Sequence, residues 1–157
     1  PFETALDMVF PPEHKLRFNA VYPGKGGDRI RWRKVERTLQ KGDDLTKEFF
    51  VDLHRVFGRH HNNAVAYAYT ELHAPRDTDA VLAIGSDDAV AVWLNGREVH
   101  RLQVGRPYVS KQDRVPVRLR KGKNTLLMKI TQGGGEWGFC VHVETPDGKP
   151  MPEVETR

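Results

Sequence analysis

Val90-Ala91-Val92-Trp93-Leu94-Asn95-Gly96-Arg97-Glu98-Val99-His100 is the stretch that decides the fold. Two strand-like runs flank Asn95-Gly96. Both turn residues accept the positive φ of a type I′ turn, which matches the twist of paired strands. The stretch therefore predicts a β-hairpin with its turn at Asn95-Gly96.

Short segments of the same kind lie on both sides of the hairpin, about 8–12 residues apart, and turn residues separate them. Turns are expected at Gly85–Asp88, Lys121–Asn124 and Gly133–Gly135. The predicted strands are Ala64–Ala74, Ala80–Ile84, Val90–Leu94, Glu98–Val104, Arg114–Leu119, Asn124–Thr131 and Trp137–Glu144. This spacing is typical of an all-β sandwich of two antiparallel sheets with about seven to nine strands, and not of βαβ units.

The ends of the chain are less regular. We expect residues 1–28 to be irregular because they are rich in Pro and Gly, and residues 145–157 to form a C-terminal tail. Apolar residues recur at helical spacing between Leu45 and Phe57, so at most one short helix is expected there. We interpret 1–157 as a single domain, and its start at Pro1 suggests a piece of a longer protein.

Alternation along the strands assigns their faces. Four apolar stripes should form most of the core: Val90, Val92 and Leu94; Val115, Val117 and Leu119; Leu126, Met128 and Ile130; Phe139, Val141 and Val143. The alternate positions point to the opposite side and hold residues that suit solvent: Arg118, Arg120, Lys129, Thr131, His142 and Glu144.

Composition excludes several classes of protein. The net charge of +4 comes from interspersed charges with no basic block, so no nucleic-acid partner is expected. No stretch reaches the ~20 apolar residues of a membrane span. Cys140 is the single cysteine, so it forms no intramolecular disulfide and belongs to no multi-cysteine zinc site.

Several motifs together resemble a known family. They are the run Ala66–Thr70, Gly85-Ser86-Asp87-Asp88 before Val92–Gly96, Val115-Pro116-Val117, Lys121–Leu127 and Gly134–Phe139. The chain resembles the galactose-binding-like jelly-roll modules of large secreted bacterial proteins. More distantly, it is similar to the sugar-binding sandwich of β-galactosidase-type hydrolases and to protective-antigen-type lectin domains. The resemblance implies a jelly-roll accessory domain located extracellularly, in the periplasm or at the cell surface, and attached to other domains of its parent protein.

Asp87 and Asp88 are candidate ligands for Ca²⁺, which takes six to eight oxygens. The lectins that the chain resembles use such a pair to hold calcium and sugar together. Here Ala89 stands where a glycine often follows the pair, and no second ligand-rich loop is evident. The alternative is that both carboxylates cap a turn between strands.

Aromatic and arginine residues are candidate sugar contacts. Trp93 has the opposite parity from Val92 and Leu94, so it could stack against a sugar ring on an outer face or contribute to the core. Trp137 shares parity with Phe139 and should close the core beneath the glycine-rich loop. Arg106 and Tyr108 share a long loop and could contact a ligand or simply lie exposed. Arg29, Arg31 and Arg33 could meet an acidic polysaccharide or form a solvated edge.

No nucleophile elbow, phosphate loop or dinucleotide motif is present. The leading hypothesis is therefore a non-catalytic module that binds a poly- or oligosaccharide. One alternative is a structural or protein-interaction sandwich that packs on a neighbouring domain and binds no sugar. Another is a small glycan-active enzyme with two facing carboxylates.

Overall fold

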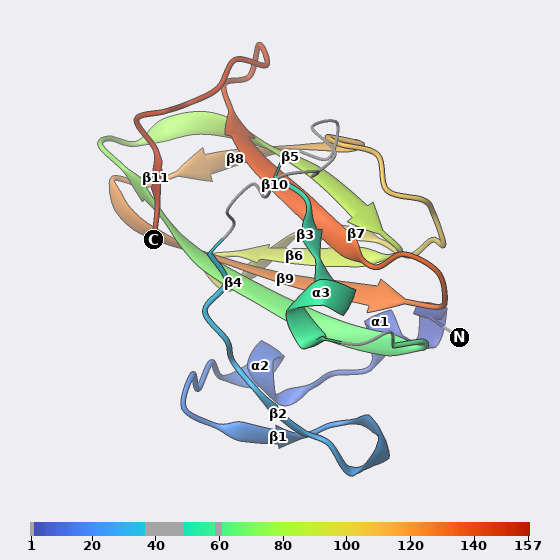
Figure 1. Cartoon of the computed structure of the whole chain (residues 1–157). Helices are drawn as coiled ribbons and strands as arrows, with labels where there is room; N and C mark the ends of the chain where they lie inside the picture. Colours follow the sequence, from blue (N-terminus) through green and yellow to red (C-terminus); the bar gives the residue numbers. More distant parts are fainter. Residues whose placement is uncertain (1, 37–48, 59–60) are drawn as a thin grey trace.

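The computed structural model describes residues 2–36, 49–58 and 61–157. Nine strands build two antiparallel sheets that pack face to face (Figure 1). They are β3 (Val51–Asp52), β4 (Ala64–Ala74), β5 (Thr78–Asp87), β6 (Val90–Leu94), β7 (Arg97–Leu102), β8 (Asp113–Leu119), β9 (Gly122–Gln132), β10 (Gly138–Glu144) and β11 (Glu155–Thr156). The predicted all-β sandwich of about seven to nine strands is confirmed.

The connectivity is that of a jelly roll. One sheet has the order β3-β10-β5-β8, and the other has the order β11-β4-β9-β6-β7. Counted along the chain from β3 to β10, the first, eighth, third and sixth strands share one sheet, and the second, seventh, fourth and fifth share the other. This interleaving of two Greek keys defines the fold. β11 extends the second sheet by pairing with β4 near His73.

The predicted hairpin with its turn at Asn95-Gly96 forms. Leu94 pairs with Arg97, which leaves Asn95-Gly96 as a two-residue loop. Their φ angles are 53° and 79°, the left-handed values that a type I′ turn requires. The Asn95 side-chain oxygen also accepts a hydrogen bond from the Thr125 N–H at 2.9 Å, so the turn is fixed to β9.

The core lies between the two sheets and consists of the four predicted stripes. All twelve of their residues belong to the main apolar cluster or pack against it. The cluster also contains Leu53, Leu72, Leu82, Ile84 and Trp137. Met151 and Val154, from the predicted C-terminal tail, also belong to it.

The N-terminal part is more ordered than its Pro and Gly content predicted. Residues 2–36, called the N-terminal segment below, contain α1 (Phe2–Asp7), α2 (Pro11–His14), β1 (Val21–Pro23), the 3₁₀ turn η1 (Lys25–Gly27) and β2 (Arg29–Arg31). Pro11 and Pro12 begin α2 instead of breaking it, because the first turn of a helix needs no N–H donors from these residues.

The number of helices also differs from the prediction of at most one. The third short helix, α3 (Leu53–Phe57), lies within the predicted region. The Asp52 side chain caps α3 by accepting from the Arg55 N–H. The part of that predicted region before residue 49 lies outside the described residues.

Three residues predicted to face solvent are buried: Lys129 and Thr131 have 0% exposure, and Glu144 has 2%. The alternation along each strand correctly predicts that these three side chains point to the outer side of the sheet. The residues that cover them come from distant parts of the chain, so the predicted exposure to solvent was wrong. Lys111 and Arg114 cover Glu144 and pair with it, and the N-terminal segment covers Lys129.

Candidate functional site

The N-terminal segment covers one half of the outer face of the five-stranded sheet. In Figure 1 its blue ribbon lies below β4, β9 and β6. The covered row consists of Ala91, Lys129 and Tyr67, which are directly opposite one another on β6, β9 and β4. Leu6 of α1 is 1% exposed and packs with Ala91 in a second, smaller apolar cluster.

Lys129 fixes this cover to the sheet. Its ammonium donates to the backbone oxygens of Leu6 at 2.8 Å and Met8 at 2.5 Å, and to Glu13 Oε1 at 2.9 Å. The Tyr67 hydroxyl donates to the same Glu13 oxygen. An ammonium has three N–H donors, so these three acceptors satisfy it completely.

The pKa values in this group reflect burial and pairing. Burial lowers the pKa of Lys129, and the neighbouring Glu13 carboxylate opposes part of this effect. Burial raises the pKa of Glu13, but the hydrogen bonds from Tyr67 and Lys129 outweigh it, so the net shift is downward. Burial and Glu13 together raise the pKa of Tyr67. Glu13 is therefore an ionised acceptor whose Oε1 already binds Lys129 and Tyr67 within the fold.

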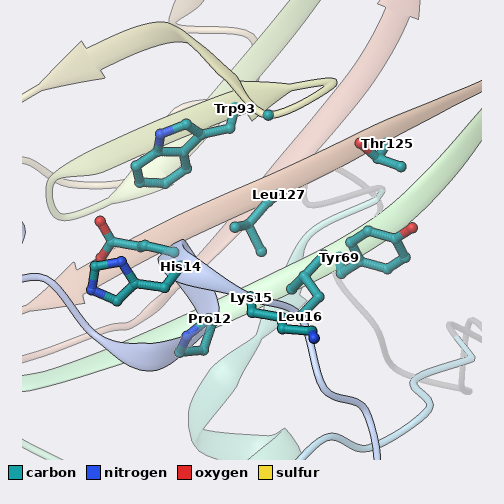
Figure 2. Close-up of a pocket in the computed structure, with 10 residues that line it drawn as sticks. Pro12, His14, Lys15, Leu16, Tyr69, Trp93, Thr125 and Leu127 are labelled. Carbon is teal, nitrogen blue, oxygen red and sulfur yellow. The ribbon is translucent and has the colours of Figure 1, made fainter.

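The next row of the same face has an aromatic residue at each end and borders a cavity. Trp93 on β6 and Tyr69 on β4 both lie directly opposite Leu127 on β9. Pro12 to Leu16 form a wall beside this row and enclose a cavity of about 230 Å³, with Gly96 and Thr125 also lining it. Figure 2 shows Trp93 and Tyr69 on either side of Leu127, with the wall facing them.

Some of the charged side chains at this cavity already have an oppositely charged partner, and one has none in the described part of the chain. Glu13 is bound by Lys129 and Tyr67, as described above. Glu71, which follows Tyr69 on the same face, accepts hydrogen bonds from the Tyr69 hydroxyl at 3.1 Å and from Lys123 at 3.2 Å. Among the described residues, no ion pair is recorded for Lys15, which is exposed in the wall. The cavity therefore presents an aromatic floor beside a lysine.

The predicted contact residue Arg106 lies elsewhere, in a hydrogen-bonded cluster between loops. Its guanidinium binds both oxygens of Asp113, at 2.9 and 2.6 Å, and donates to Ser86 Oγ at 2.8 Å. Burial raises the pKa of Asp113, but the hydrogen bonds from Arg106 and His100 lower it below its ordinary value. These contacts give Arg106 a role in holding the loop between β7 and β8.

Asp87 and Asp88 are 7% and 9% exposed and are joined by a cis peptide bond. Asp88 accepts from the Arg106 N–H at 3.0 Å with one oxygen and from the Gly133 N–H at 2.9 Å with the other. Within the described ranges, no group of three or more His, Cys, Asp or Glu side chains could hold a metal ion. The donors around Asp88 thus fit the turn-capping alternative better than a calcium ligand set, and calcium stays a prediction.

The other two predicted aromatic residues lie away from the cavity. The Tyr108 ring packs against Phe50, with centroids 4.4 Å apart. Trp137 is 2% exposed and stacks on Phe57 at 5.7 Å, which places it in the core as predicted. Of the candidate contact residues, the structure places Trp93 in the cavity and does not bring Arg106 or Tyr108 to it.

Sequence reasoning missed the partners of Trp93. Tyr69 had a usable signal, because in Ala66-Tyr67-Ala68-Tyr69 the small residues face the core and the tyrosines face outward. His14 and Lys15 carried no such signal, since they reach the sheet only through the path of the N-terminal segment.

Comparisons with known proteins give one result that bears on the fold. No family model matches the chain, and no curated protein matches it either. Among solved structures, the chain is similar to the PA14 domain of MpAFP antifreeze protein, with a TM-score of 0.50 and 10% sequence identity. The match covers 62% of this chain and 54% of that one, so it spans about half of that chain's length. At this identity the likeness shows a shared β-sandwich fold alone, and it does not single out the galactose-binding-like group.

No helix among the described residues has the length and apolar content that crossing a membrane requires.

Proposed function

We propose that this domain is a non-catalytic carbohydrate-binding module. The observation that carries the proposal is the cavity floored by Trp93, Leu127 and Tyr69 on the outer face of a jelly roll. Aromatic side chains offer a flat apolar surface to the C–H face of a sugar ring, and their polar ends remain available for hydrogen bonds. The likeness of the fold to a PA14 domain supports the proposal by analogy.

The cavity suits a binding function better than a catalytic one. Glycoside hydrolysis needs a carboxyl group that can give up a proton and a second one that acts as base or nucleophile. Glu13, Glu71 and Glu98 are carboxylates beside this row, and each already accepts a hydrogen bond from a cationic side chain. We therefore propose that the module concentrates its parent protein on a glycan outside the cytoplasm, without performing chemistry.

The test is a glycan panel probed with the isolated domain, with and without calcium, followed by a reducing-end release assay on the glycans that bind. We expect binding in the roughly micromolar to millimolar range, equivalent to about 4–8 kcal/mol, and no release of new reducing ends. Absence of binding to every glycan under both conditions would refute the proposed function. A calcium requirement would show that the acidic pair takes part after all.

One observation favours packing against a neighbouring domain as a second function. Met8 and Val9, which connect α1 to α2, are 53% and 60% exposed although both are apolar. Exposed apolar residues in adjacent positions are typical of contact surfaces when they extend into a larger patch. If packing is the function, the glycan panel should be negative, and replacing Met8 with Gln and Val9 with Thr should reduce binding to an adjoining domain of the parent protein.

A further inference from the structure

Two neighbouring rows of the outer sheet face meet the N-terminal segment in different ways. In the first row, Lys129 is satisfied by acceptors from that segment. One row further along β9, Leu127 lies between Trp93 and Tyr69. At this row Pro12 to Leu16 border a cavity above the sheet.

The aromatic surface extends beyond the cavity. Phe18 lies 4.9 Å from Tyr69 and 5.4 Å from Trp32, measured between ring centroids, and it is 48% exposed. Adjacent strands are about 4.8 Å apart, so Trp93 and Tyr69, two strand spacings apart, have backbones separated by roughly 10 Å. A row of aromatic residues over this distance suits several consecutive rings of a chain, with one ring in the cavity and the others across the surface.

The charged side chains around the cavity indicate which class of glycan it would bind. The carboxylates on this face are engaged: Glu13 by Lys129, Glu71 by Lys123 and Glu98 by Arg101. Lys15, in the cavity wall, has no recorded ion pair in the part of the chain that the structure describes. A neutral sugar would leave this ammonium unused, whereas an anionic group would form a charge-assisted hydrogen bond with it.

We propose that the cavity between α2 and the Asn95-Gly96 hairpin binds an anionic polysaccharide. A sugar ring stacks on Trp93, and its carboxylate or sulfate group binds Lys15. The chain continues over Tyr69 toward Phe18. This inference rests on the proposed function and specifies the site and the ligand class.

The experiment measures dissociation constants by titration calorimetry for three hexasaccharides of one linkage. The first is built from a uronic acid. The second is the same chain after its carboxyl groups have been reduced to hydroxymethyl groups, and the third is the reduced chain carrying sulfate esters. We expect the uronate or the sulfated chain to bind at least about fivefold more tightly than the neutral chain, and this advantage should shrink as salt is added. Preference for one anionic chain over the other identifies the anionic group.

Two variants locate the site. Trp93→Leu keeps an apolar side chain against Leu6 and removes the stacking surface, so all three dissociation constants should rise by about tenfold or should exceed the measurable range. Lys15→Met keeps the aliphatic stem and removes the charge, so it should abolish the advantage of the anionic chains over the neutral chain. Lys149→Met is the matched control, because Lys149 is an exposed lysine in the loop after β10. Figure 1 draws that loop at the opposite end of the view from α2.

The outcomes separate the two proposals. If the glycan panel is negative throughout, the proposed function fails. If the panel contains binders but the neutral hexasaccharide binds as tightly as the anionic ones, or if Lys15→Met behaves like Lys149→Met, the inference is overturned and the function stands. Lys15 is exposed, so this result does not depend on whether Trp93→Leu folds; thermal unfolding of each variant checks that point.

Discussion

Replacing Lys129 with Met tests whether a buried ion pair holds the N-terminal segment on the sheet. The side chain of Lys129 is 0% exposed and that of Glu13 is 11% exposed. Removing one partner of a buried pair typically destabilises a protein by about 3–5 kcal/mol, because the other charge is left without compensation. Water can reach Glu13 in part, so we expect a loss near the lower limit, about 3 kcal/mol. For a domain of this size that loss lowers Tm by roughly 10 °C.

The assay is urea unfolding, combined with hydrogen exchange of peptides from residues 2–16. Exchange distinguishes global destabilisation from local release of the segment. Lys123→Met is the matched control: Lys123 also projects outward from β9, but its side chain is 55% exposed, so its loss should change stability by less than about 1 kcal/mol. Adding Glu13→Gln to Lys129→Met should restore much of the loss, because no unpaired charge remains. The reasoning is refuted if Lys129→Met matches the control in both stability and exchange.

Three further predictions concern stability. Gly96→Ala should lower the free energy of unfolding in urea by about 1 kcal/mol, because alanine is strained at a φ of 79°. The added Cβ would meet no atom within 4 Å, so the backbone strain is the whole effect. An unchanged free energy of unfolding would argue against the type I′ turn. Arg106→Gln should cost about 3 kcal/mol by leaving Asp113 buried without its guanidinium, yet glycan affinity should not change. The pKa values of Glu13 and Asp113 are lowered on folding, so their contribution is present above their unfolded values of roughly 4 and is lost below them. Unfolding midpoints measured across pH 2–7 should therefore fall below about pH 4, and a flat profile there would contradict the assignment.

The sandwich could be predicted because its signals are local. Asn95-Gly96 sets a turn by its own backbone preferences, and Val90, Val92 and Leu94 alternate with the period of a strand whatever lies opposite them. The predicted strand bounds Ala64–Ala74 and Val90–Leu94 agree with the structure residue for residue. The prediction for residues 1–28 differed from the structure because Pro11 and Pro12 end a helix in most contexts but begin one at its first turn.

The candidate site was only partly predictable for a different reason. Alternation placed Trp93 on the side opposite Val92 and Leu94, which is a property of its own strand, and it left open whether that side was core or outer surface. Arg106 and Tyr108 looked like ligand contacts because they share a loop, but the structure supplies Asp113 to one and Phe50 to the other. Loop residues obtain their partners from other loops, and no local pattern in the sequence encodes that choice.

The hairpin at Asn95-Gly96 and the alternating faces of the strands were predicted from the sequence alone, since each follows from backbone geometry and a period of two. Alternation put Trp93 on the side opposite Val92 and Leu94, and only the tertiary structure decided between core and outer surface for it. What an outward side chain contacts was decided by the tertiary structure. Lys129 and Leu127 lie on the same side of the same strand and are 0% and 8% exposed, yet Lys129 is hydrogen-bonded to α1 and α2 whereas Leu127 lines a cavity between α2 and the sheet. That difference arises from a segment more than 100 residues away in the chain, and burial is a property of every element that packs on a surface.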